Sequence, residues 1–448
     1  MRYDLIVAGA GSSGICAALA AARLGEKVLL IDKNAFPGGT NTASMVCPLM
    51  GFHSGKRQIV KGIAQEIIDN LKKRNATLGH VEDPIGEVAT VTPIEPSQLR
   101  FVYFDLLSKE SNIDILFNTF ISDVGIKNNK IENLTIVNKS GTSKVSANYF
   151  IDATGDGDVA ALCKIPFDTG RSSDSLSQPM TLVFKIGNVD FKKIREYIRN
   201  KPEQFVCDDS GKIDKYLAVS GYFDLVKKAK DNDDFDIPRD RVLFFQGINP
   251  SEIFVNTTRV IRKSGLSAED LTEATIEAYR QIDILMEFFK KYVPGFENSY
   301  VVEVANQIGV RESRRFHCMD TLTLEDIYEE REKQDSIAVC AYPIDIHDPN
   351  GSELTWIKTS ASFAYDIPYG VMVPNKYENI LITGRCISSQ HEAQASLRIT
   401  PTMMAVGQAA GSAAHVAIKD KCSYKDVDVA KVQKILRKNG AVVSKKDV

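Results

Sequence analysis

The sequence predicts an α/β fold with a central parallel sheet, a β-meander and an inserted mixed α+β segment. Three observations lead to this prediction. A strand, a glycine-rich loop, a helix and a second strand open the chain, and two later apolar strands, at 149–154 and 378–384, also lead into glycine. Between these two strands, the alternation of strands and helices breaks down. Alternating strands and helices are typical of parallel sheets, because each crossover helix covers one face of the sheet.

The opening unit consists of an apolar strand at 3–8, a glycine loop, an alanine-rich helix at about 11–24 and a second strand at 27–31. The loop reads Gly9-Ala10-Gly11-Ser12-Ser13-Gly14, and Asp32 and Lys33 follow the second strand. A glycine loop between a strand and a helix, with an acid after the next strand, predicts a Rossmann-like dinucleotide-binding unit.

Each conserved feature of that motif has a physical role. Gly9 permits the tight turn, Gly11 lets the backbone approach a pyrophosphate, and Gly14 lets the helix pack closely on the sheet. The helix N–H groups and dipole face the phosphates, and Asp32 can accept hydrogen bonds from a ribose. Gly38-Gly39-Thr40 follows, which the motif does not require and which favours FAD over NAD.

The next segment is expected to be irregular up to residue 96, with a helix near 62–75. A helix at 97–108 has Ser97 as its expected N-cap. Strands are expected at 113–117 and 120–126, the segment 130–137 is expected to be part of a small β-meander, and Ile121 is expected to contact the cofactor. The strand at 149–154 brings Ala153, Thr154 and Gly155 near the cofactor, and Asp156 and Asp158 are interpreted as turn and N-cap residues rather than catalytic ones.

Here the chain resembles a known family. A strand ending in Ala153-Thr154-Gly155, after a glycine loop and a meander, is similar to the glutathione-reductase-like FAD fold. The form ATGDGDVA at 153–160 is closer to the FAD-dependent oxidoreductases related to the fumarate reductase flavoproteins. The resemblance implies an FAD-binding domain in two parts, 1–164 and 346–448, and a substrate or cap domain at 165–345.

The inserted segment predicts strands at 178–186, 242–248 and 253–258, helices at 191–200 and 271–292, and a solvated acidic loop at 231–236. Near its end, Arg311 and Arg314 would share one face of a helix. They could clamp a carboxylate or phosphate, or form an interdomain ion pair with Glu312. His347 is either a proton donor or a structural histidine.

The C-terminal block is the second strong signal. A strand at 378–384 ends at Gly384, followed by Arg385, and a helix of small residues starts at about Pro401 and runs to about 419. Its small residues let the helix approach the sheet closely, and its N-terminus would direct positive dipole at a flavin. The order GRC, HEA, R, PT and GQAAG is typical of the family's flavin-binding segment, which implies cofactor contacts from Pro401, Met403, Met404 and Gly407. Many relatives carry an acid where Arg385 stands, so its side chain either contacts phosphate or contributes only backbone.

His391, Glu392 and Arg398 lie between two cofactor-contacting elements and are the main catalytic candidates, together with Arg311 and His347. An imidazole there could pass a proton, and Arg398 could hold an anionic substrate. Alternatively, His391 and Glu392 orient the loop and Arg398 packs against the FAD phosphate.

Composition excludes several classes. The net charge of −3 over 448 residues gives no reason to expect a nucleic-acid partner. No run of 18 apolar residues predicts membrane insertion, and a strand starting at residue 3 leaves no room for a signal peptide, so a cytoplasmic location is expected. The eight cysteines contain no CxxC pair, so no metal site is expected, and Cys47 is interpreted as a structural thiol.

The predicted function is hydride transfer between a small organic substrate, which could be anionic, and a tightly bound FAD. Oxygen, a nicotinamide or a quinone-like molecule could be the second electron partner. A tRNA-modifying flavoprotein and a non-catalytic FAD-binding sensor or scaffold are the alternatives, and the sequence assigns no oligomeric state.

Overall fold

The structure is a computed structural model that describes residues 2–206, 211–351, 354–357, 360 and 362–448. Its main sheet has seven strands in the order β8-β2-β1-β11-β10-β9, and β24 pairs with β11 beside β10. β8, β2, β1, β11 and β24 are parallel, whereas β9, β10 and the first half of β11 form the antiparallel meander. The strands are β1 (Arg2–Ala8), β2 (Val28–Ile31), β8 (Ile113–Leu116), β9 (Phe120–Lys127), β10 (Lys130–Asn138), β11 (Gly141–Asp152) and β24 (Ile380–Ile382).

The carboxyl ends of the parallel strands form one row. Ala8 is the register partner of both Ile31 and Asp152, and Asp152 is the partner of Ile382. The loops that follow these four strands therefore leave the same edge of the sheet side by side. In open α/β sheets this edge is where ligands bind.

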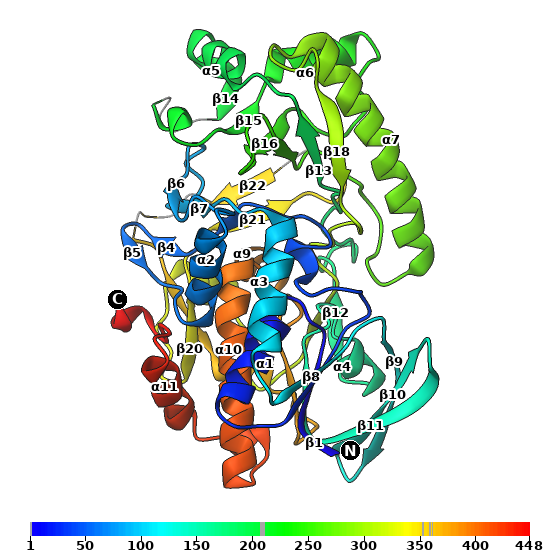
Figure 1. Ribbon diagram of the computed structural model, residues 1–448, viewed down its shortest axis with the longest axis vertical. Helices are drawn as coiled ribbons and strands as arrows, with labels where there is room; N and C mark the ends of the chain where they lie inside the picture. The colour runs from blue at the N-terminus through cyan, green and yellow to red at the C-terminus, as the bar shows by residue number, and fades with distance from the viewer. Residues whose placement is uncertain (1, 207–210, 352–353, 358–359, 361) are drawn as a thin grey trace.

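Helices α1 (Ser12–Arg23) and α10 (Thr400–Asp420) pack against each other along the main sheet (Figure 1). A Cβ at Gly407 would lie 2.1 Å from the carbonyl oxygen of Ser13, and a Cβ at Gly411 would lie 2.2 Å from that of Ala17. The small residues of α10 thus permit close packing, as predicted, but their main partner is α1 rather than the sheet. The other helices around this sheet are α2 (Ile63–Lys73), α3 (Pro96–Ser108), α4 (Asp158–Leu162), α9 (His391–Leu397) and α11 (Val429–Lys438).

A second, six-stranded sheet lies in the upper part of Figure 1 beside the long helix α7, and its strands are antiparallel in the order β14-β15-β16-β17-β13-β18. It consists of β13 (Phe184–Gly187), β14 (Phe205–Val206), β15 (Ala218–Gly221), β16 (Val242–Gln246), β17 (Ile253–Val255) and β18 (Tyr300–Val304). Its helices are α5 (Phe191–Asn200), α6 (Phe223–Asp231) and α7 (Ala268–Tyr292). The predicted pairing of the strands near 242–248 and 253–258 is confirmed. The domain boundaries at 164/165 and 345/346 stay a prediction.

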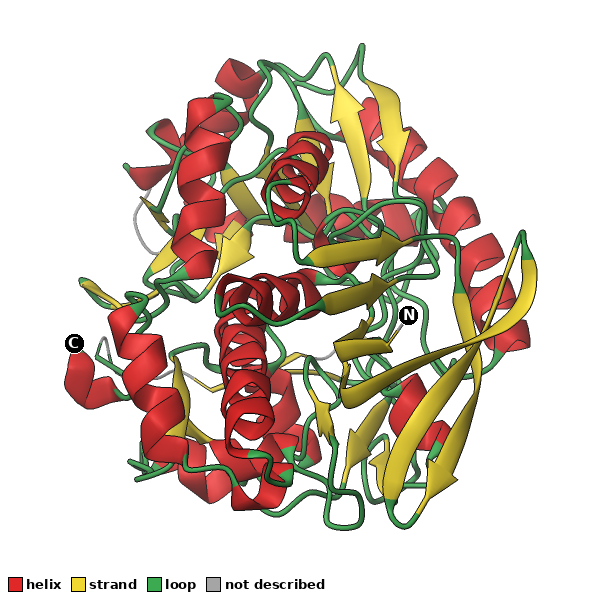
Figure 2. Cartoon of the chain, turned by 60° about the horizontal axis from the view of Figure 1, so that its bottom comes forward, coloured by secondary structure: helices red, strands yellow, loops and turns green. Residues whose placement is uncertain are grey.

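The remaining strands are short and form sheets of two or three strands. They are β3 (Leu49–Met50), β4 (His53–Ser54), β5 (Arg57–Gln58), β6 (Val81–Glu82), β7 (Thr90–Thr92), β12 (Phe167–Thr169), β19 (Arg314–Phe316), β20 (Ser336–Cys340), β21 (Ile344–His347), β22 (Leu354–Ile357) and β23 (Tyr365–Pro368). The short helix α8 (Leu324–Tyr328) precedes β20 in the chain. Ile85 and Val91 pack in a small core with Tyr216 and Phe245 of the second-sheet region. The early segment around β6 and β7 therefore covers the second sheet. Figure 2 shows the long meander strands at the opposite side of the molecule from the C-terminus.

Several local predictions were wrong. Ser97 is not the N-cap of α3, because Pro96 takes the first helical position and Glu95 precedes it as N-cap. α4 begins at Asp158 with Gly157, at φ 67°, as its N-cap. Residues 178–183 make isolated bridges rather than a regular strand, so β13 begins only at Phe184.

The segment with three arginines is not helical. Residues 309–313 run as an extended loop, and Arg314 starts β19. Gly309 pairs with Thr181, and its N–H donates to the Thr181 carbonyl at 2.8 Å, which holds this segment in extended form. Arg311 and Arg314 consequently do not share a helix face. Among the described residues, no helix has both the length and the apolar character that crossing a membrane requires.

Candidate functional site

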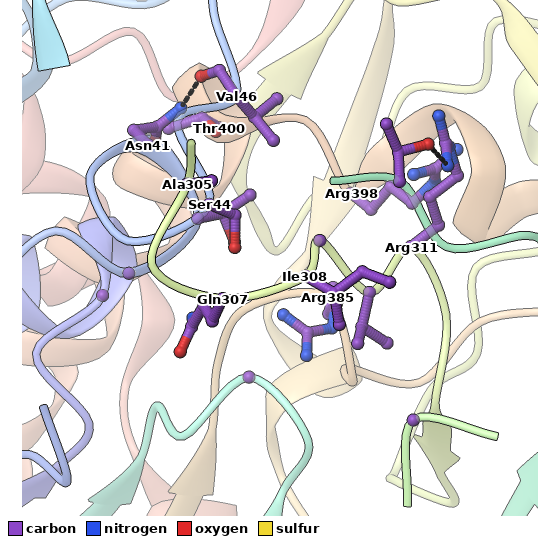
Figure 3. A pocket seen from close by; sticks show the side chains of 18 of the residues that line it. Asn41, Ser44, Val46, Ala305, Gln307, Ile308, Arg311, Arg385, Arg398 and Thr400 are labelled. Carbon is purple, nitrogen blue, oxygen red and sulfur yellow. Dashed lines mark hydrogen bonds between the residues drawn. The ribbon is translucent and has the colours of Figure 1, made fainter. Parts of the chain in front are cut away.

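A single elongated cavity of about 860 Å³ follows the row of strand ends and continues to the second sheet. At one end it is lined by the loops after β1 and β2, with Gly9 and Asp32. In the middle lie the loops after β11 and β24, and at the far end Arg239 and His347 come from the second-sheet region and β21. Figure 3 shows part of this cavity, with Arg311 and Arg398 side by side on one flank.

Two glycine loops meet at the first end. The Gly38 N–H donates to the carbonyl of Ala10 at 2.7 Å, and a Cβ at Gly39 would lie 3.0 Å from the Cα of Gly11. By contrast, a Cβ at Gly11 would meet no atom within 4 Å, because that side of the residue opens into the cavity. The Gly11 backbone is therefore exposed for close approach by a bound group.

The first turn of α1 offers backbone donors to the cavity. Its N-cap is Gly11, which has no side chain to satisfy them. The neighbouring hydroxyls face the protein instead: Ser12 Oγ donates to Asn41 Oδ1 at 3.0 Å, and Ser13 Oγ lies 2.7 Å from Thr383 Oγ1. A helix N-terminus with free N–H groups is suited to an anion such as a phosphate.

Asp32 closes this end. Its Oδ2 accepts from the Ala10 N–H at 2.6 Å and its Oδ1 accepts from the Asn34 N–H at 2.7 Å. Burial raises the pKa of this carboxyl, although both hydrogen bonds oppose the shift. The carboxylate is thus fixed in place at the end of β2, in the position that the dinucleotide motif requires.

Arg385 is held by a neighbouring acid in the middle of the cavity. Its Nη2 lies 2.5 Å from Asp156 Oδ1. Burial acts to raise the pKa of Asp156, but Arg385, Ser313 and Lys33 together outweigh it and keep the pKa below its usual value. Gly384, at φ 95°, has no atom within 4 Å of a built Cβ and lines the cavity, so its backbone is open like that of Gly11.

The start of α10 reaches the same region. Thr400 lines the cavity, Ile399 is the N-cap without a side-chain hydrogen bond, and Pro401 occupies the first turn. The uncapped first turn directs its positive end toward the middle of the cavity. Asn41 Nδ2 donates to the carbonyl of Val46 at 2.8 Å, which fixes the loop that carries both residues, and Figure 3 shows this hydrogen bond on the same side of the view as Thr400.

The far end is charged. Arg311 Nη1 donates to the carbonyl of Pro179 at 2.6 Å and to Thr181 Oγ1 at 2.7 Å, and Arg398 Nη2 donates to Gln178 Oε1 at 3.2 Å. Burial, and then the charge of Arg398, lowers the pKa of Arg311 well below its usual value. Arg239 and Arg259 add to this effect, and the charge of Asp345 opposes it.

His347 and Asp345 lie beside these arginines on β21. His347 Nδ1 is 3.3 Å from Arg259 Nη1, and its Nε2 is 3.3 Å from Asp345 Oδ2. A guanidinium can only donate, so Nδ1 is the acceptor and the Nε2–H group donates to Asp345. Burial lowers the pKa of His347 to about 3, so the imidazole is neutral at physiological pH. Burial acts to raise the pKa of Asp345, but His347 and Arg398 outweigh it and hold the pKa below its usual range.

Glu87 faces the same end from the loop between β6 and β7. Burial, followed by the nearby carboxylates Asp345 and Asp83, raises its pKa to about 8. A carboxyl group with this pKa carries its proton at neutral pH and can give or take one. Tyr342, whose hydroxyl donates to Asp345 Oδ2 at 3.4 Å, completes this part of the wall.

Most residues predicted for the site line the cavity. These are Gly9, Gly11, Ser12, Ser13, Asp32, Lys33, Gly39, Thr40, Ile121, Ala153, Thr154, Gly155, Arg311, His347, Gly384, Arg385, Arg398 and Met403. The others lie behind its wall: Gly14, Gly38, His391, Glu392, Pro401, Met404 and Gly407. Gly14 and Gly407 serve packing, because a Cβ at either would lie about 2 Å from a backbone oxygen. His391 Nδ1 contacts Glu312 Oε1 at 2.8 Å.

Sequence reasoning missed several lining residues. Glu87, Arg239, Tyr342 and Asp345 belong to this group, as does the segment 305–310. Tyr342 and Asp345 stand beside His347 in a segment whose polar residues were visible in the sequence. Glu87 follows a Pro-Ile-Gly turn, and Arg239 precedes a strand, so neither carries a local signal for a site.

Comparison with known proteins gives a consistent family. A family model described as FAD dependent oxidoreductase matches residues 4–436. Among solved structures, p-nitrophenol 4-monooxygenase from Pseudomonas putida is similar at a TM-score of 0.53 and 12% identity, covering 97% of this chain and 84% of that one. A geranylgeranyl bacteriochlorophyll reductase-like protein from Thermoplasma acidophilum is similar at a TM-score of 0.51 and 14% identity, covering 98% and 83%. At these identities the two structures show a shared fold.

Proposed function

Because this chain belongs to the FAD-dependent oxidoreductase family, we propose that it transfers a hydride between a small organic substrate and FAD inside the cavity. The observation that carries the proposal is the continuity of the cavity. It runs from the glycine loops at Gly11 and Asp32, past Gly384, to the charged end at Arg311 and Arg398. A cofactor that lies along the strand ends would therefore reach a second compartment of the cavity, which is lined by other residues.

The residues present fit FAD. Gly11 and Gly384 each leave open the space that a Cβ would fill, and both face the cavity. In the proposal, the first turn of α1 binds the pyrophosphate, Asp32 binds the adenosine ribose, and the first turn of α10 stabilises negative charge on the reduced ring. The Arg385–Asp156 ion pair fixes the loops at the junction between the two compartments.

When bound, FAD supplies the two-electron chemistry, and the protein supplies position, electrostatics and proton transfer. Arg311 and Arg398 hold the substrate against the ring position. Glu87 exchanges the proton: its acid form donates when the substrate is reduced, and its carboxylate accepts when the substrate is oxidised. The neutral His347 keeps Asp345 in place through its Nε2–H group.

Anaerobic flavin bleaching tests the proposal. The purified protein, loaded with FAD, is mixed under nitrogen with panels of small acids, alcohols and amines while the flavin band is followed. We expect at least one compound to bleach the band, and the Glu87→Gln variant to slow the bleaching by about 100-fold, within the usual contribution of a general acid or base. A protein that binds FAD but reacts with oxygen and a nicotinamide only, with no organic substrate in any panel, would contradict the proposal.

Two further expectations belong to this proposal: a cytoplasmic location and the absence of a nucleic-acid partner. The expected absence of a nucleic-acid partner rests on the net charge of −3, and the expected location rests on the lack of an apolar run of 18 residues. Fractionation of cells that express the tagged chain tests the location. A gel-shift assay with total tRNA tests the second expectation and, if binding is seen, favours a tRNA-modifying flavoprotein instead.

A further inference from the structure

The arginines of the cavity fall into two groups. Arg241, Arg314 and Arg385 each pair with an acid of the same wall: Arg241 with Asp240 at 2.8 Å, Arg314 with Asp158 at 3.1 Å, and Arg385 with Asp156 at 2.5 Å. Arg239, Arg311 and Arg398 line the cavity as well, but none of the ion pairs found among the described residues includes them.

In the second group Arg239 is buried, Arg311 and Arg398 are half-buried, and Arg239 and Arg398 each have an unpartnered donor. Arg239 is 6% exposed, its Nε donates to the carbonyl of Thr257 at 3.2 Å, and its Nη2 finds no partner within the part of the chain that the structure describes. Arg398 Nε is also buried without a partner in that part of the chain. A buried donor on a charged group that stays unpartnered is costly. This cost is removed if a ligand supplies the missing acceptors.

The three guanidinium groups have little compensating charge. Burial first, and then the charges of neighbouring arginines, lower the pKa of both Arg239 and Arg311. Asp345 is the ionised carboxylate on the same wall, and Glu87 is protonated at neutral pH because of its raised pKa. The balance at this end of the cavity is therefore positive by more than one charge.

The positions of the three guanidinium groups suggest two points at which a ligand could be bound. Arg311 and Arg398 lie next to each other on one flank (Figure 3), on the loop before β19 and at the end of α9. Arg239 comes from the segment that precedes β16 in the second sheet. Planar guanidinium forks bind carboxylate and phosphate oxygens in pairs, which a single lysine ammonium does not.

We propose that the substrate of this site is a small organic dianion, with one carboxylate or phosphate group held by Arg311 and Arg398 and a second held by Arg239. The proposal rests on the function proposed above, because it names the substrate class of the same compartment. Asp345 Oδ1, which is buried and has no hydrogen-bond partner among the described residues, is left to accept from a donor on the substrate.

The test is equilibrium binding to the FAD-loaded protein, followed by calorimetry and by the perturbation of the flavin spectrum. The probes are the dianions malonate, succinate and glutarate, butyrate as the monoanion, and succinamide as the neutral analogue. Phosphoglycolate is the phosphate-bearing probe and carries more than two negative charges at neutral pH. We expect at least one dianion to bind about tenfold or more tightly than butyrate, since one charge-assisted contact is worth at least that factor. A preference for phosphoglycolate over the dicarboxylates, or the reverse, identifies which anionic group Arg239 takes.

Variants assign the contacts. Arg239→Met, Arg311→Met and Arg398→Met are each expected to weaken the best dianion by about tenfold or more, and Arg→Lys at the same positions to restore only part of the affinity. The matched control is the double variant Asp240→Asn/Arg241→Met, which removes a guanidinium from the same wall without changing its net charge. It is expected to keep the affinity for the dianion within about twofold, because a partly exposed ion pair such as Arg241–Asp240 contributes little free energy. Bound FAD in each variant reports that the protein is folded.

The outcomes separate this inference from the proposed function. Binding of a dianion without flavin bleaching supports the inference and counts against hydride transfer to that ligand. Bleaching by an uncharged compound, with no dianion bound at millimolar concentration, keeps the proposed function and overturns the inference. Equal affinity for succinate and succinamide overturns it as well.

Discussion

His391 Nδ1 lies 2.8 Å from Oε1 of Glu312, and both side chains are buried behind the cavity wall. The same carboxylate pairs with Arg315 and accepts from the backbone N–H of Gln178 at 3.1 Å. The side-chain oxygen of Gln178 in turn accepts from Arg398. We therefore infer that His391 acts on the cavity through Glu312 and Gln178, as a positioning residue.

The first prediction concerns this network. His391→Gln is expected to lower the free energy of unfolding by about 1–3 kcal/mol, because a hydrogen bond to a buried carboxylate is lost or weakened. FAD content and the rate of flavin reduction at saturating substrate should change by less than about tenfold, whereas KM rises through Arg398. Denaturant titration and single-turnover kinetics provide the measurements. A 100-fold loss of kcat at unchanged stability would assign proton transfer to His391 itself.

The second prediction separates cofactor contact from packing at the glycine loop. In Gly11→Val the new side chain enters the cavity, since no protein atom lies within 4 Å of the Cβ position. We expect FAD affinity to fall by about 100-fold or more while the apoprotein melts at the wild-type temperature. Gly14→Ala is the contrast, because its Cβ would lie 1.9 Å from the carbonyl oxygen of Gly9 and should destabilise the apoprotein. Wild-type FAD occupancy in Gly11→Val would contradict the assignment of the loop.

Gly407 gives the third prediction. Alanine is a better helix former than glycine, by about 1 kcal/mol, which by itself would stabilise α10. The Cβ of Gly407→Ala would, however, lie 2.1 Å from the Ser13 carbonyl oxygen and force α10 away from α1. We expect a net destabilisation of about 1–3 kcal/mol, equal with and without FAD, in calorimetric melting. Lys419→Ala, at the exposed end of the same helix, is the control and should melt near the wild-type temperature.

Gly11, Asp32 and Gly407 illustrate what the sequence can and cannot predict. The nucleotide end of the site follows from local rules: a glycine at Gly11 and an acid at Asp32 have defined spacing within one βαβ unit, and the structure has the predicted strand, helix and strand there. The packing of Gly407 on Ser13 does not follow from local rules, because the two residues lie about 400 positions apart in the chain. The expected contact of Gly407 with the cofactor stays a prediction. Sequence showed that small residues are needed on α10 but not which element packs against them.

The charged end could not be assembled from sequence for the same reason. Glu87, Arg239 and Asp345 come from three segments, and only the packing of the β6–β7 region on the second sheet brings them to one wall. The helix expected around Arg311 failed because tertiary pairing overrode local pattern: the bridge between Gly309 and Thr181 holds the chain extended. Arginine spacing indicates a shared face only where the backbone is helical.

The fourth prediction concerns Lys185, whose Nζ lies 2.9 Å from both carboxylate oxygens of Glu95 and 3.3 Å from Glu252. Lys185 and Glu95 are 5% and 7% exposed, and the pair joins β13 of the second sheet to the start of α3. Lys185→Met should destabilise the protein by about 3–5 kcal/mol, because two carboxylates then lack their partner. The double variant Glu95→Leu/Lys185→Met should recover part of this loss in thermal melting, and failure to recover any would argue against the pair as the cause.

The fifth prediction is a pH dependence that arises from Glu87. Burial, and then Asp345 and Asp83, raises its pKa from the usual 4.5 to about 8. Between these two values the folded protein keeps a proton that the unfolded chain has released, so stability must fall as the pH rises through this window. Glu87→Gln removes that penalty, because the amide does not ionise.

The variant should therefore be close to wild type in stability at pH 5 and more stable than wild type at pH 8.5, by on the order of 1 kcal/mol or more. Melting temperatures measured across this range in one buffer series test the sign. Glu82→Gln, an exposed position on β6 with the same loss of charge, is the control and should follow the wild-type profile. If Glu87→Gln instead loses stability at high pH, Glu87 is ionised in the folded protein and stabilised by Arg239 and Arg241, and it would then act on the substrate as a base rather than as an acid.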